Sequence, residues 1–320
     1  MSQWLLNRVN DIERVKLFFN LWARLSRIPF LSVGILPLIL GFVLAWKRGY
    51  KGSFEIYLIS TITVLLIMEM TYYLGEFNDQ RGDQLNKNFN RFSGGSRVLV
   101  EGEISPLIAL ILGYGCLLVA IFLIVYIYIQ FQRDPRIFIL GGLGIFSGYF
   151  YSNKPFKWSH HGIGEILIAI CYGWLPIASG FFITSGFFSK DIISLSIPVA
   201  LSIFNVILIN EFPDEEADRV IGKRNMVVRL GKQRAGDLYI GISIFTALSF
   251  IKVISKFNKT PIWIWIISAL PLLLILINLM LVWREKYYDK EKLENLCFNT
   301  LIVNLLITMT LTIQQMFIIF

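Results

Sequence analysis

Residues 54–83 read FEIYLISTITVLLIMEMTYYLGEFNDQRGD, and residues 192–218 read IISLSIPVALSIFNVILINEFPDEEAD. Each stretch begins with an apolar run of about 20 residues, the length that a helix needs to cross the hydrocarbon core of a bilayer. Each run ends in the same acidic pattern, Glu-x-x-Asp-x-x-x-Asp, which starts at Glu76 in the first copy and at Glu211 in the second. The two stretches therefore predict two membrane-spanning helices with matching acidic ends.

The composition extends this prediction to the whole chain. Of its 320 residues, 55% are hydrophobic and only 16% are charged. In a typical soluble domain, about a quarter of all residues are charged. The apolar runs are continuous rather than alternating, which excludes a transmembrane β-barrel. We predict an all-α membrane protein, a bundle of nine transmembrane helices with a pseudo-repeat and a cytoplasm-facing polar cavity. The expected spans are residues 28–46, 54–76, 104–130, 137–152, 162–186, 192–212, 235–256, 261–283 and 296–318.

Residues 1–27 are predicted to form a separate cytoplasmic or interfacial segment that precedes the nine-helix domain of residues 28–320. Charged residues interrupt this segment, so it lacks the short apolar region of a cleavable signal peptide. Its apolar residues instead recur at helical spacing: Trp4, Leu5, Leu6, Val9, Ile12, Val15, Phe18, Phe19 and Trp22. Such an amphipathic helix fits the membrane interface or a position against the protein's own cytoplasmic loops.

The net charge of +8 reflects membrane topology. Most Lys and Arg residues fall in the N-terminal segment and in the loops that follow spans 2, 4, 6 and 8. The positive-inside rule then places the N-terminus and both acidic motifs in the cytoplasm. Membrane topology therefore accounts for the excess of basic residues, and a nucleic acid partner is not needed to explain it. The three cysteines, Cys116, Cys171 and Cys297, lie in apolar runs and have no metal-ligand or disulfide spacing.

The acidic motifs suggest a divalent metal site. A spacing of i, i+3, i+7 places three carboxylates on one face of a helix, where they repel each other unless a cation lies between them. Mg²⁺ takes one or two carboxylates and completes its shell with water and substrate phosphates. Two motifs that face one cavity would suit two Mg²⁺ ions and a diphosphate. The alternative is that these charges only solvate cytoplasmic helix ends.

Several stretches of the chain resemble the UbiA superfamily of intramembrane aromatic prenyltransferases. Asn210-Glu-x-x-Asp214-x-x-x-Asp218 is similar to the acidic signature of that superfamily. Three further stretches look like its 1,4-dihydroxy-2-naphthoate polyprenyltransferase branch: residues 90–102, residues 151–165 and residues 218–231.

The resemblance implies an enzyme, a membrane polyprenyltransferase that joins an isoprenyl diphosphate to an aromatic acceptor. The acceptor would be 1,4-dihydroxy-2-naphthoate, in the synthesis of menaquinone-type lipid quinones, with two Mg²⁺ ions as cofactors. Metal ligands would be Glu76, Asp79, Asp83, Asn210, Glu211, Asp214 and Asp218, of which Asp79, Asp83, Asp214 and Asp218 would be catalytic. Contacts to the diphosphate would come from Arg91, Arg97, Tyr151, Lys157, Lys223 and Arg224. The lipid tail would leave the cavity between helices into the membrane.

Two further acidic residues are candidates for the acceptor pocket. Glu69 lies well inside the second span, where an ionisable side chain is costly and often functional. It could line the pocket or act as a catalytic base, or it could be a neutral group bonded to a neighbouring helix. Glu165 opens the fifth span in Gly-Ile-Gly-Glu, and its alternative is a charge favoured by the helix dipole.

Other functions remain open at the level of sequence. The acceptor could be hydroxybenzoate, homogentisate, a phenazine or a glycerol phosphate lipid. A secondary transporter also has repeats and intramembrane acids, but its repeats are commonly inverted and its sites lie at mid-membrane. The two motif copies here have the same orientation and lie at helix ends. A non-catalytic lipid-binding relative is the third alternative.

Overall fold

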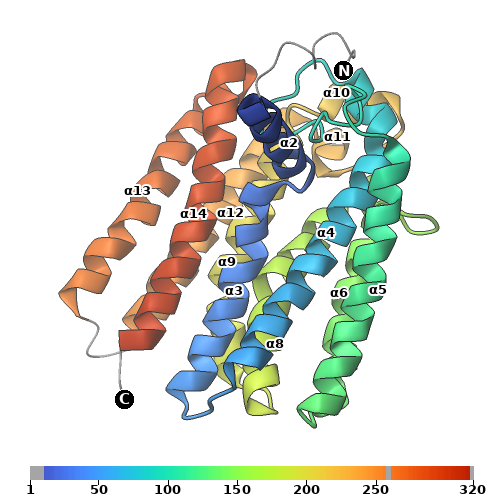
Figure 1. Ribbon diagram of the computed structural model, residues 1–320. Helices are drawn as coiled ribbons and strands as arrows, with labels where there is room; N and C mark the ends of the chain where they lie inside the picture. Colours follow the sequence, from blue (N-terminus) through green and yellow to red (C-terminus); the bar gives the residue numbers. More distant parts are fainter. Residues whose placement is uncertain (1–10, 257–260, 318–320) are drawn as a thin grey trace.

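The computed structural model describes residues 11–256 and 261–317 and is built of helices (Figure 1). Eight helical segments are long and apolar enough to cross a membrane. Seven of them are single helices: α3 (Ile28–Lys47), α4 (Phe54–Leu85), α5 (Pro106–Gln130), α9 (Lys190–Asn210), α12 (Lys232–Ser255), α13 (Ile262–Trp283) and α14 (Lys290–Phe317). The eighth consists of α7 (Gly164–Ile168), the π-helical η2 (Ala169–Trp174) and α8 (Leu175–Ser185). No strand of a sheet occurs within these ranges.

The remaining predicted span corresponds to α6 (Arg136–Ser152), which has 17 residues. This is shorter than the roughly 20 residues of a full crossing, so the structure supports eight spans by length and hydropathy. Its glycines allow close packing on its neighbours. A Cβ at Gly141 would lie 2.5 Å from Ile124 Cδ1 of α5, and a Cβ at Gly148 would lie 2.2 Å from Thr71 Oγ1 of α4.

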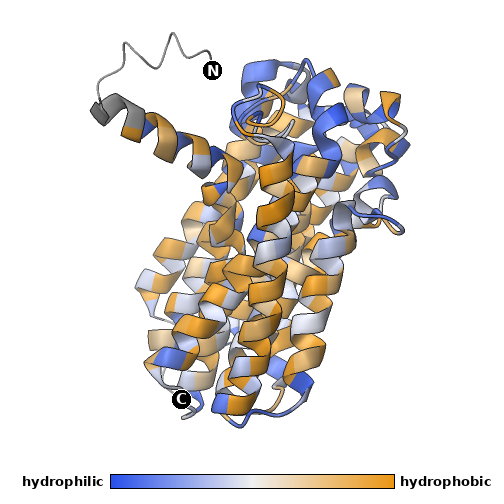
Figure 2. Ribbon diagram, turned by 45° about the vertical axis from the view of Figure 1, so that its right-hand side comes forward, coloured by the Kyte–Doolittle hydropathy of each residue, from blue (hydrophilic) through white to orange (hydrophobic). Residues whose placement is uncertain are grey.

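Short helices and long loops gather at one end of the bundle, which we call the polar end. Figure 2 shows apolar residues along the bundle and hydrophilic residues concentrated at this end. It carries α2 (Asp11–Leu25), α10 (Glu215–Val220) and α11 (Met226–Leu230), together with the 3₁₀ segments η1 (Trp158–His160) and η3 (Lys286–Tyr288). The loops between α4 and α5, α6 and α7, and α9 and α12 all contribute to it.

Helix α4 is long enough to reach from the bundle into this end. Its 32 residues correspond to about 48 Å, whereas the hydrocarbon core is about 30 Å thick. Ser53 caps its first turn by accepting a hydrogen bond from the Ile56 backbone N–H, 3.3 Å away. The last turns of α4 therefore extend beyond the apolar section and carry the first acidic motif.

Close backbone contacts and buried amides hold the bundle together. Gly41 of α3 and Gly180 of α8 face each other's helices, and a Cβ at either position would lie 2.3 Å from a carbonyl oxygen of the opposite helix. Small residues of this kind allow membrane helices to approach closely. Asn304 of α14 donates to Ser202 Oγ of α9 over 2.8 Å, which adds a polar contact between buried helices.

The described part of the N-terminal segment forms α2, and residues 1–10 of the predicted amphipathic segment lie outside the described residues. Val15, Phe18 and Phe19 are exposed. The last turn instead packs on the polar end, where Leu25 is fully buried against Val98 and Leu99. The helix therefore combines an exposed apolar surface with a docked C-terminal turn.

Candidate active site

Both acidic motifs line one cavity of about 190 Å³ at the polar end. Helix α4 contributes the first motif, and the segment from the end of α9 through α10 contributes the second. All seven carboxylate and amide side chains singled out from the sequence line this cavity: Glu76, Asp79, Asp83, Asn210, Glu211, Asp214 and Asp218. We refer to it as the acidic cavity.

The first motif has the predicted helical geometry, since Glu76, Asp79 and Asp83 all lie within α4. Glu76 is buried and both of its carboxylate oxygens already have donors. Oε1 accepts from the Ser96 backbone N–H at 2.8 Å and pairs with Arg27 Nη2 at 2.9 Å, while Oε2 accepts from Ser96 Oγ at 2.7 Å. Glu76 therefore holds two parts of the protein in place: Arg27, and the loop between α4 and α5 that carries Ser96.

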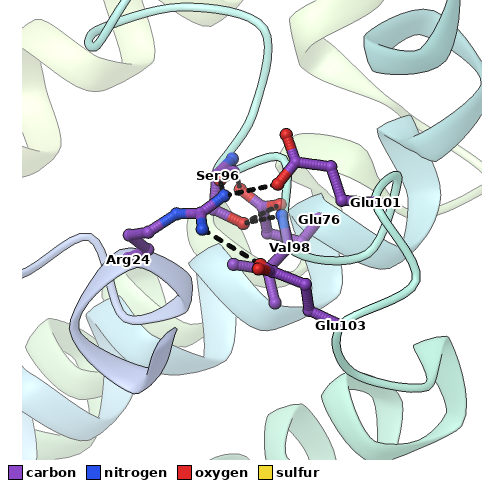
Figure 3. Close-up of polar contacts among 6 residues, drawn as sticks. All are labelled: Arg24, Glu76, Ser96, Val98, Glu101 and Glu103. Atoms are coloured by element: carbon purple, nitrogen blue, oxygen red, sulfur yellow. Dashed lines mark hydrogen bonds and ion pairs between the residues drawn. The ribbon is translucent and has the colours of Figure 1, made fainter. Parts of the chain in front are cut away.

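Arg24 of α2 holds the same loop from its other side, as Figure 3 shows. Its guanidinium donates to the Ser96 carbonyl at 3.2 Å, to Glu101 at 2.9 Å and to Glu103 at 3.0 Å. The loop is thus fixed between α2 and the acidic face of α4.

Gly95 allows this loop to cover the first motif closely. It has φ +70°, and a Cβ built on it would lie 2.2 Å from Asp83 Oδ2. Any residue other than glycine would need a rarely adopted backbone conformation and would also displace the Asp83 carboxylate.

The second motif differs from the prediction of three carboxylates on one helical face. Helix α9 ends at Asn210, residues 211–214 form a turn, and α10 begins at Glu215. Pro213 explains the break, because a proline disfavours helical backbone in the preceding residue and cannot donate a helix hydrogen bond. The turn directs Glu211 and Asp214 into the cavity without a continuous helix.

Direct contacts join the two motifs. Asn86, which follows the last turn of α4, donates from Nδ2 to Asp214 Oδ1 over 2.6 Å. A Cβ at Gly82 of α4 would lie 2.9 Å from Ile221 Cδ1, directly after α10. The acidic ends of the two halves are therefore packed against each other.

Burial raises the pKa of carboxylates in the second motif. Burial and the neighbouring Asp218 carboxylate raise the pKa of Asp214 to about 7. Burial, followed by the nearby Glu165, also raises the pKa of Glu211 well above its usual value. These groups need a cation beside them to be ionised together.

One lysine supplies part of that positive charge. Lys223 lines the cavity and its Nζ lies 3.3 Å from Asp218 Oδ2. Burial alone would lower the pKa of Lys223, but the carboxylates of Asp218, Asp79 and Asp214 outweigh it and raise that pKa well above its usual value. Asn225 donates to the same Asp218 oxygen over 2.8 Å.

The structure separates four of the six predicted diphosphate contacts from the acidic cavity. Tyr151 lines it, whereas Arg91, Arg97, Lys157 and Arg224 do not. The Arg91 side chain is 86% exposed and pairs with Glu294 at 3.2 Å. Arg97 donates to the Asp83 carbonyl and lies over the Phe89 ring, with 4.3 Å from Cζ to the ring centroid. Lys157 and Arg224 line a separate recess at the surface.

Neither predicted acceptor-pocket acid lines the acidic cavity. Glu69 lies beside the hydrogen-bonded pair Ser26 and Tyr73. Glu165 is buried, and its Oε1 accepts from the Met226 backbone N–H over 2.6 Å. Glu165 therefore fixes the start of α11, and Glu69 faces the junction of α2 and α3.

Four site residues were absent from the sequence-based set. Arg27 lines the cavity and pairs with Glu76, and Asn86 and Ser96 bind motif carboxylates. His160 lies with Nε2 3.9 Å from Asp79 Oδ1. Arg27 could have been singled out from the sequence, because it is a positively charged residue directly before the first apolar run. Ser96 and His160 lie in the stretches that resemble the naphthoate branch, residues 90–102 and 151–165, but no spacing marked them individually, and no local pattern pointed to Asn86.

An apolar cavity of about 100 Å³ adjoins the acidic one. It is lined along α4, α5, α6 and α8 by residues such as Ile67, Ile124 and Leu175. Four residues line both cavities: Thr71, Tyr151, Ile168 and Tyr172. An elongated apolar group could therefore continue from the acidic cavity into the bundle.

The donors of the acidic cavity suit a magnesium ion that retains water and phosphate ligands. Asn210 Oδ1 and Glu211 Oε2 are buried and have no hydrogen-bond partner among the described residues. No three His, Cys, Asp or Glu side chains within residues 11–256 and 261–317 are arranged to hold a metal by themselves. Mg²⁺ commonly takes only one or two protein carboxylates, so the donor set fits this ion together with a phosphate ligand.

Comparison with known proteins places these features in a family context. The family model described as UbiA prenyltransferase family matches residues 33–302. The chain is 27% identical over 285 residues to 2-carboxy-1,4-naphthoquinone phytyltransferase of Synechocystis sp., with 87% of each chain covered. It is 23% identical over 300 residues to 1,4-dihydroxy-2-naphthoate octaprenyltransferase of Escherichia coli, covering 92% of this chain and 96% of that one.

The fold is also similar to a solved structure. A UbiA homolog from Archaeoglobus fulgidus, solved bound to GPP and Mg²⁺, superposes with a TM-score of 0.65 at 20% identity. The match covers 93% of this chain and all of the other, so the similarity extends over nearly the whole bundle.

Proposed function

The chain belongs to the UbiA prenyltransferase family, and from this premise we propose that it transfers a polyprenyl group from an isoprenyl diphosphate to 1,4-dihydroxy-2-naphthoate. This reaction would serve the synthesis of a menaquinone-type lipid quinone. The observation that carries the proposal is the convergence of both acidic motifs on one cavity that continues into an apolar one. A diphosphate with an attached hydrocarbon chain has the same polar and apolar parts.

We assign the diphosphate to the acidic cavity. Two Mg²⁺ ions held by Asp79, Asp83, Asn210, Asp214 and Asp218 would neutralise the diphosphate and make it a better leaving group. Glu211, with one oxygen unpartnered, is a further candidate ligand. Glu76 is left out of this set because Arg27 and Ser96 already occupy its oxygens.

Lys223 and Arg27 are proposed to bind the phosphate oxygens directly, since both line the cavity and carry fixed positive charge. When the bond between the allylic carbon and the diphosphate oxygen breaks, the electron pair leaves with the diphosphate. The aromatic rings of Tyr72, Tyr151 and Tyr172 line the same cavity, and their π faces would favour the allylic cation.

The acceptor ring carbon then forms a bond to that cation, and carbon dioxide or a proton leaves the ring. The protein contributes by aligning the two partners and excluding water. The apolar residues shared with the second cavity direct the prenyl chain away from the charged groups. Glu69 and Glu165 are assigned no contact with either substrate, because neither lines the acidic cavity or the apolar one.

The identity of the acceptor is supported by the names of the naphthoate-modifying relatives. Hydroxybenzoate, homogentisate, a phenazine and a glycerol phosphate lipid are the alternative acceptors. Transport is disfavoured because the acids lie at helix ends in a prenyltransferase family fold.

We also propose that α6 completes a ninth crossing and that the polar end faces the cytoplasm. A 17-residue helix can cross if its polar flanks reach the interface. The excess of Lys and Arg in the N-terminal segment and in the loops of the polar end supports this orientation.

The test is turnover by purified protein supplied with Mg²⁺, geranylgeranyl diphosphate and a panel of aromatic acceptors, with products identified by mass spectrometry. We expect a prenylated naphthoate and stoichiometric diphosphate. A product formed only with another acceptor would overturn the assignment of substrate, and solute flux without a covalent product would overturn the enzymatic role.

A further inference from the structure

A basic recess of about 690 Å³ lies at the polar end, outside the acidic cavity. Two segments form it: the connection between α6 and α7, and the stretch from the end of α10 into α11. Its lining consists of six basic residues and two small turn residues: Lys154, Pro155, Lys157, His160, His161, Gly222, Arg224 and Arg229.

The basic side chains of this recess outnumber the carboxylates beside them in the described part of the chain. No carboxylate in residues 11–256 and 261–317 lies within ion-pair distance of Lys154, Lys157, Arg224 or Arg229, as the described ion pairs occur elsewhere. Among the described residues, Asp79 is the acid that interacts with the lining: it lies 3.9 Å from His160 Nε2 and is also influenced by the charge of Lys157. At least four positive charges therefore surround one hollow.

One backbone hydrogen bond joins the two segments, and a side-chain bond braces the second of them. The Arg224 backbone N–H donates to the His160 carbonyl over 3.0 Å, and Arg229 Nε donates to the Arg224 carbonyl over 2.7 Å. Gly162, at φ +66°, lies so close that a Cβ would be 3.0 Å from Arg229 Nε. Contacts within the protein therefore hold the Arg224 backbone and the Arg229 side chain at the recess.

Apolar and aromatic side chains lie beside the recess. Phe156 and Trp158 stack with ring centroids 5.4 Å apart, and Phe156 also contacts Phe146 and Phe150 of α6. Phe156 is 43% exposed, and Ile163 and Ile166 at the start of the next span are 49% and 48% exposed. Aromatic residues next to basic ones are typical of the membrane–water boundary.

The loop between α6 and α7 also stands at that boundary in the fold. It projects sideways from the bundle, below the helices of the polar end, in Figure 1, where it is the yellow-green loop on the right. It connects the end of α6 to a span that begins at Gly164. A ligand in the recess would therefore be within reach of the lipid headgroups.

We propose that this recess binds the phosphate headgroup of an anionic phospholipid, with the acyl chains against Phe156, Ile163 and Ile166. Unpaired lysines and arginines supply the attraction for the phosphate. The exposed apolar residues explain why the ligand is a lipid rather than a soluble anion. The inference is independent of the proposed acceptor, because the recess lies outside the acidic cavity.

The experiment compares lipid binding to purified full-length protein in neutral detergent by native mass spectrometry. Phosphatidylglycerol and phosphatidylcholine are the two lipids, and the variant is Lys154→Gln/Arg229→Gln. The matched control is Lys286→Gln/Lys292→Gln, which removes two exposed charges elsewhere at the polar end, from η3 and from the first turn of α14. We expect phosphatidylglycerol to bind the wild type and the control, and to bind the recess variant about tenfold more weakly.

Phosphatidylcholine should bind all three proteins weakly. Lys154→Gln alone, which touches no hydrogen bond of the fold, should weaken phosphatidylglycerol binding about threefold. Unchanged phosphatidylglycerol binding in both recess variants would overturn the site. Displacement of the lipid by millimolar inorganic phosphate would show that the recess recognises a soluble anion and would overturn its assignment to lipid.

Discussion

Asn86 donates a hydrogen bond of 2.6 Å to Asp214, which lies 128 residues later in the chain. Asn86 terminates the helix that carries the first acidic motif, and Asp214 lies in the turn of the second. This contact therefore joins the two halves of the acidic cavity directly at a motif carboxylate.

We expect Asn86→Ala to lower kcat/KM by about tenfold, because a hydrogen bond to a charged group contributes about 1.5–3 kcal/mol. Steady-state turnover with varied Mg²⁺ measures the effect. Asn86→Asp should be at least as damaging, since it places a second carboxylate against Asp214.

Asn88→Ala is the matched control for that prediction. Asn88 Nδ2 donates to Glu216 Oε2 over 3.2 Å in an exposed pair between the same two segments. Exposed contacts of this kind contribute little, so turnover should stay within about twofold. Equal losses in the Asn86 and Asn88 variants would contradict the special role of the buried contact.

Asp79→Asn and Asp214→Asn should each reduce turnover by at least about 100-fold while the protein remains folded. Each substitution keeps the shape of the side chain and removes a negative charge from the proposed metal and diphosphate site. Glu216→Gln, on α10 but outside the cavity lining, serves as control. A purified Asp79→Asn/Asp214→Asn protein with normal turnover would exclude the metal assignment.

Chelation of divalent ions should abolish turnover, and added Mg²⁺ should restore it. Because an ion that binds only the folded state stabilises it, Mg²⁺ with a non-hydrolysable diphosphate analogue should also raise Tm by several degrees. Thermal denaturation of wild type and Asp214→Asn separates binding from chemistry. An identical shift in both proteins would place the ion elsewhere.

The features that sequence could predict are those with a local pattern. Continuous apolar runs predicted the membrane helices, and the repeated spacing of Asp79, Asp83, Asp214 and Asp218 singled out residues that line one cavity. The predicted span of residues 137–152 corresponds closely to α6, but the 17 residues of this helix fall below the roughly 20 of a full crossing.

The rest of the site depends on contacts between distant segments. Arg27 reaches Glu76 across 49 residues and Ser96 reaches it across 20, and no spacing rule connects such pairs. The resemblance implies a diphosphate contact for Arg91, but the Arg91 side chain pairs with Glu294 outside the acidic cavity. Pro213 did signal the end of α9, and its effect on the second motif could have been predicted.

Gly95→Ala should reduce turnover by at least about tenfold, because its Cβ would lie 2.2 Å from Asp83 Oδ2 in the covering loop. Gly102→Ala provides a close control in the same loop. Gly102 has the same φ of +70° but open space around its Cβ position, so it incurs only the backbone cost of about 1 kcal/mol. Similar activity of the two variants would mean that the loop does not position Asp83.

Gly144→Leu should shorten the prenyl chain that the enzyme accepts. Gly144 lines the apolar cavity, where Ile67 and Leu175 lie 3.6 and 3.7 Å from its Cβ position. An alanine would fit this space, but a leucine would extend into the room left for the hydrocarbon chain.

Turnover with geranylgeranyl diphosphate should therefore fall by at least about tenfold, while turnover with dimethylallyl diphosphate stays within about twofold. Gly142→Leu is the control, since Gly142 is exposed on another face of α6 and has nothing within 4 Å of its Cβ position. Both variants add the same side chain to the same helix. A loss of helix stability would therefore lower turnover with both diphosphate donors in both proteins. A selective loss with the long donor in Gly144→Leu alone would identify the apolar cavity as the site of the prenyl chain, and an equal loss with both donors would exclude it.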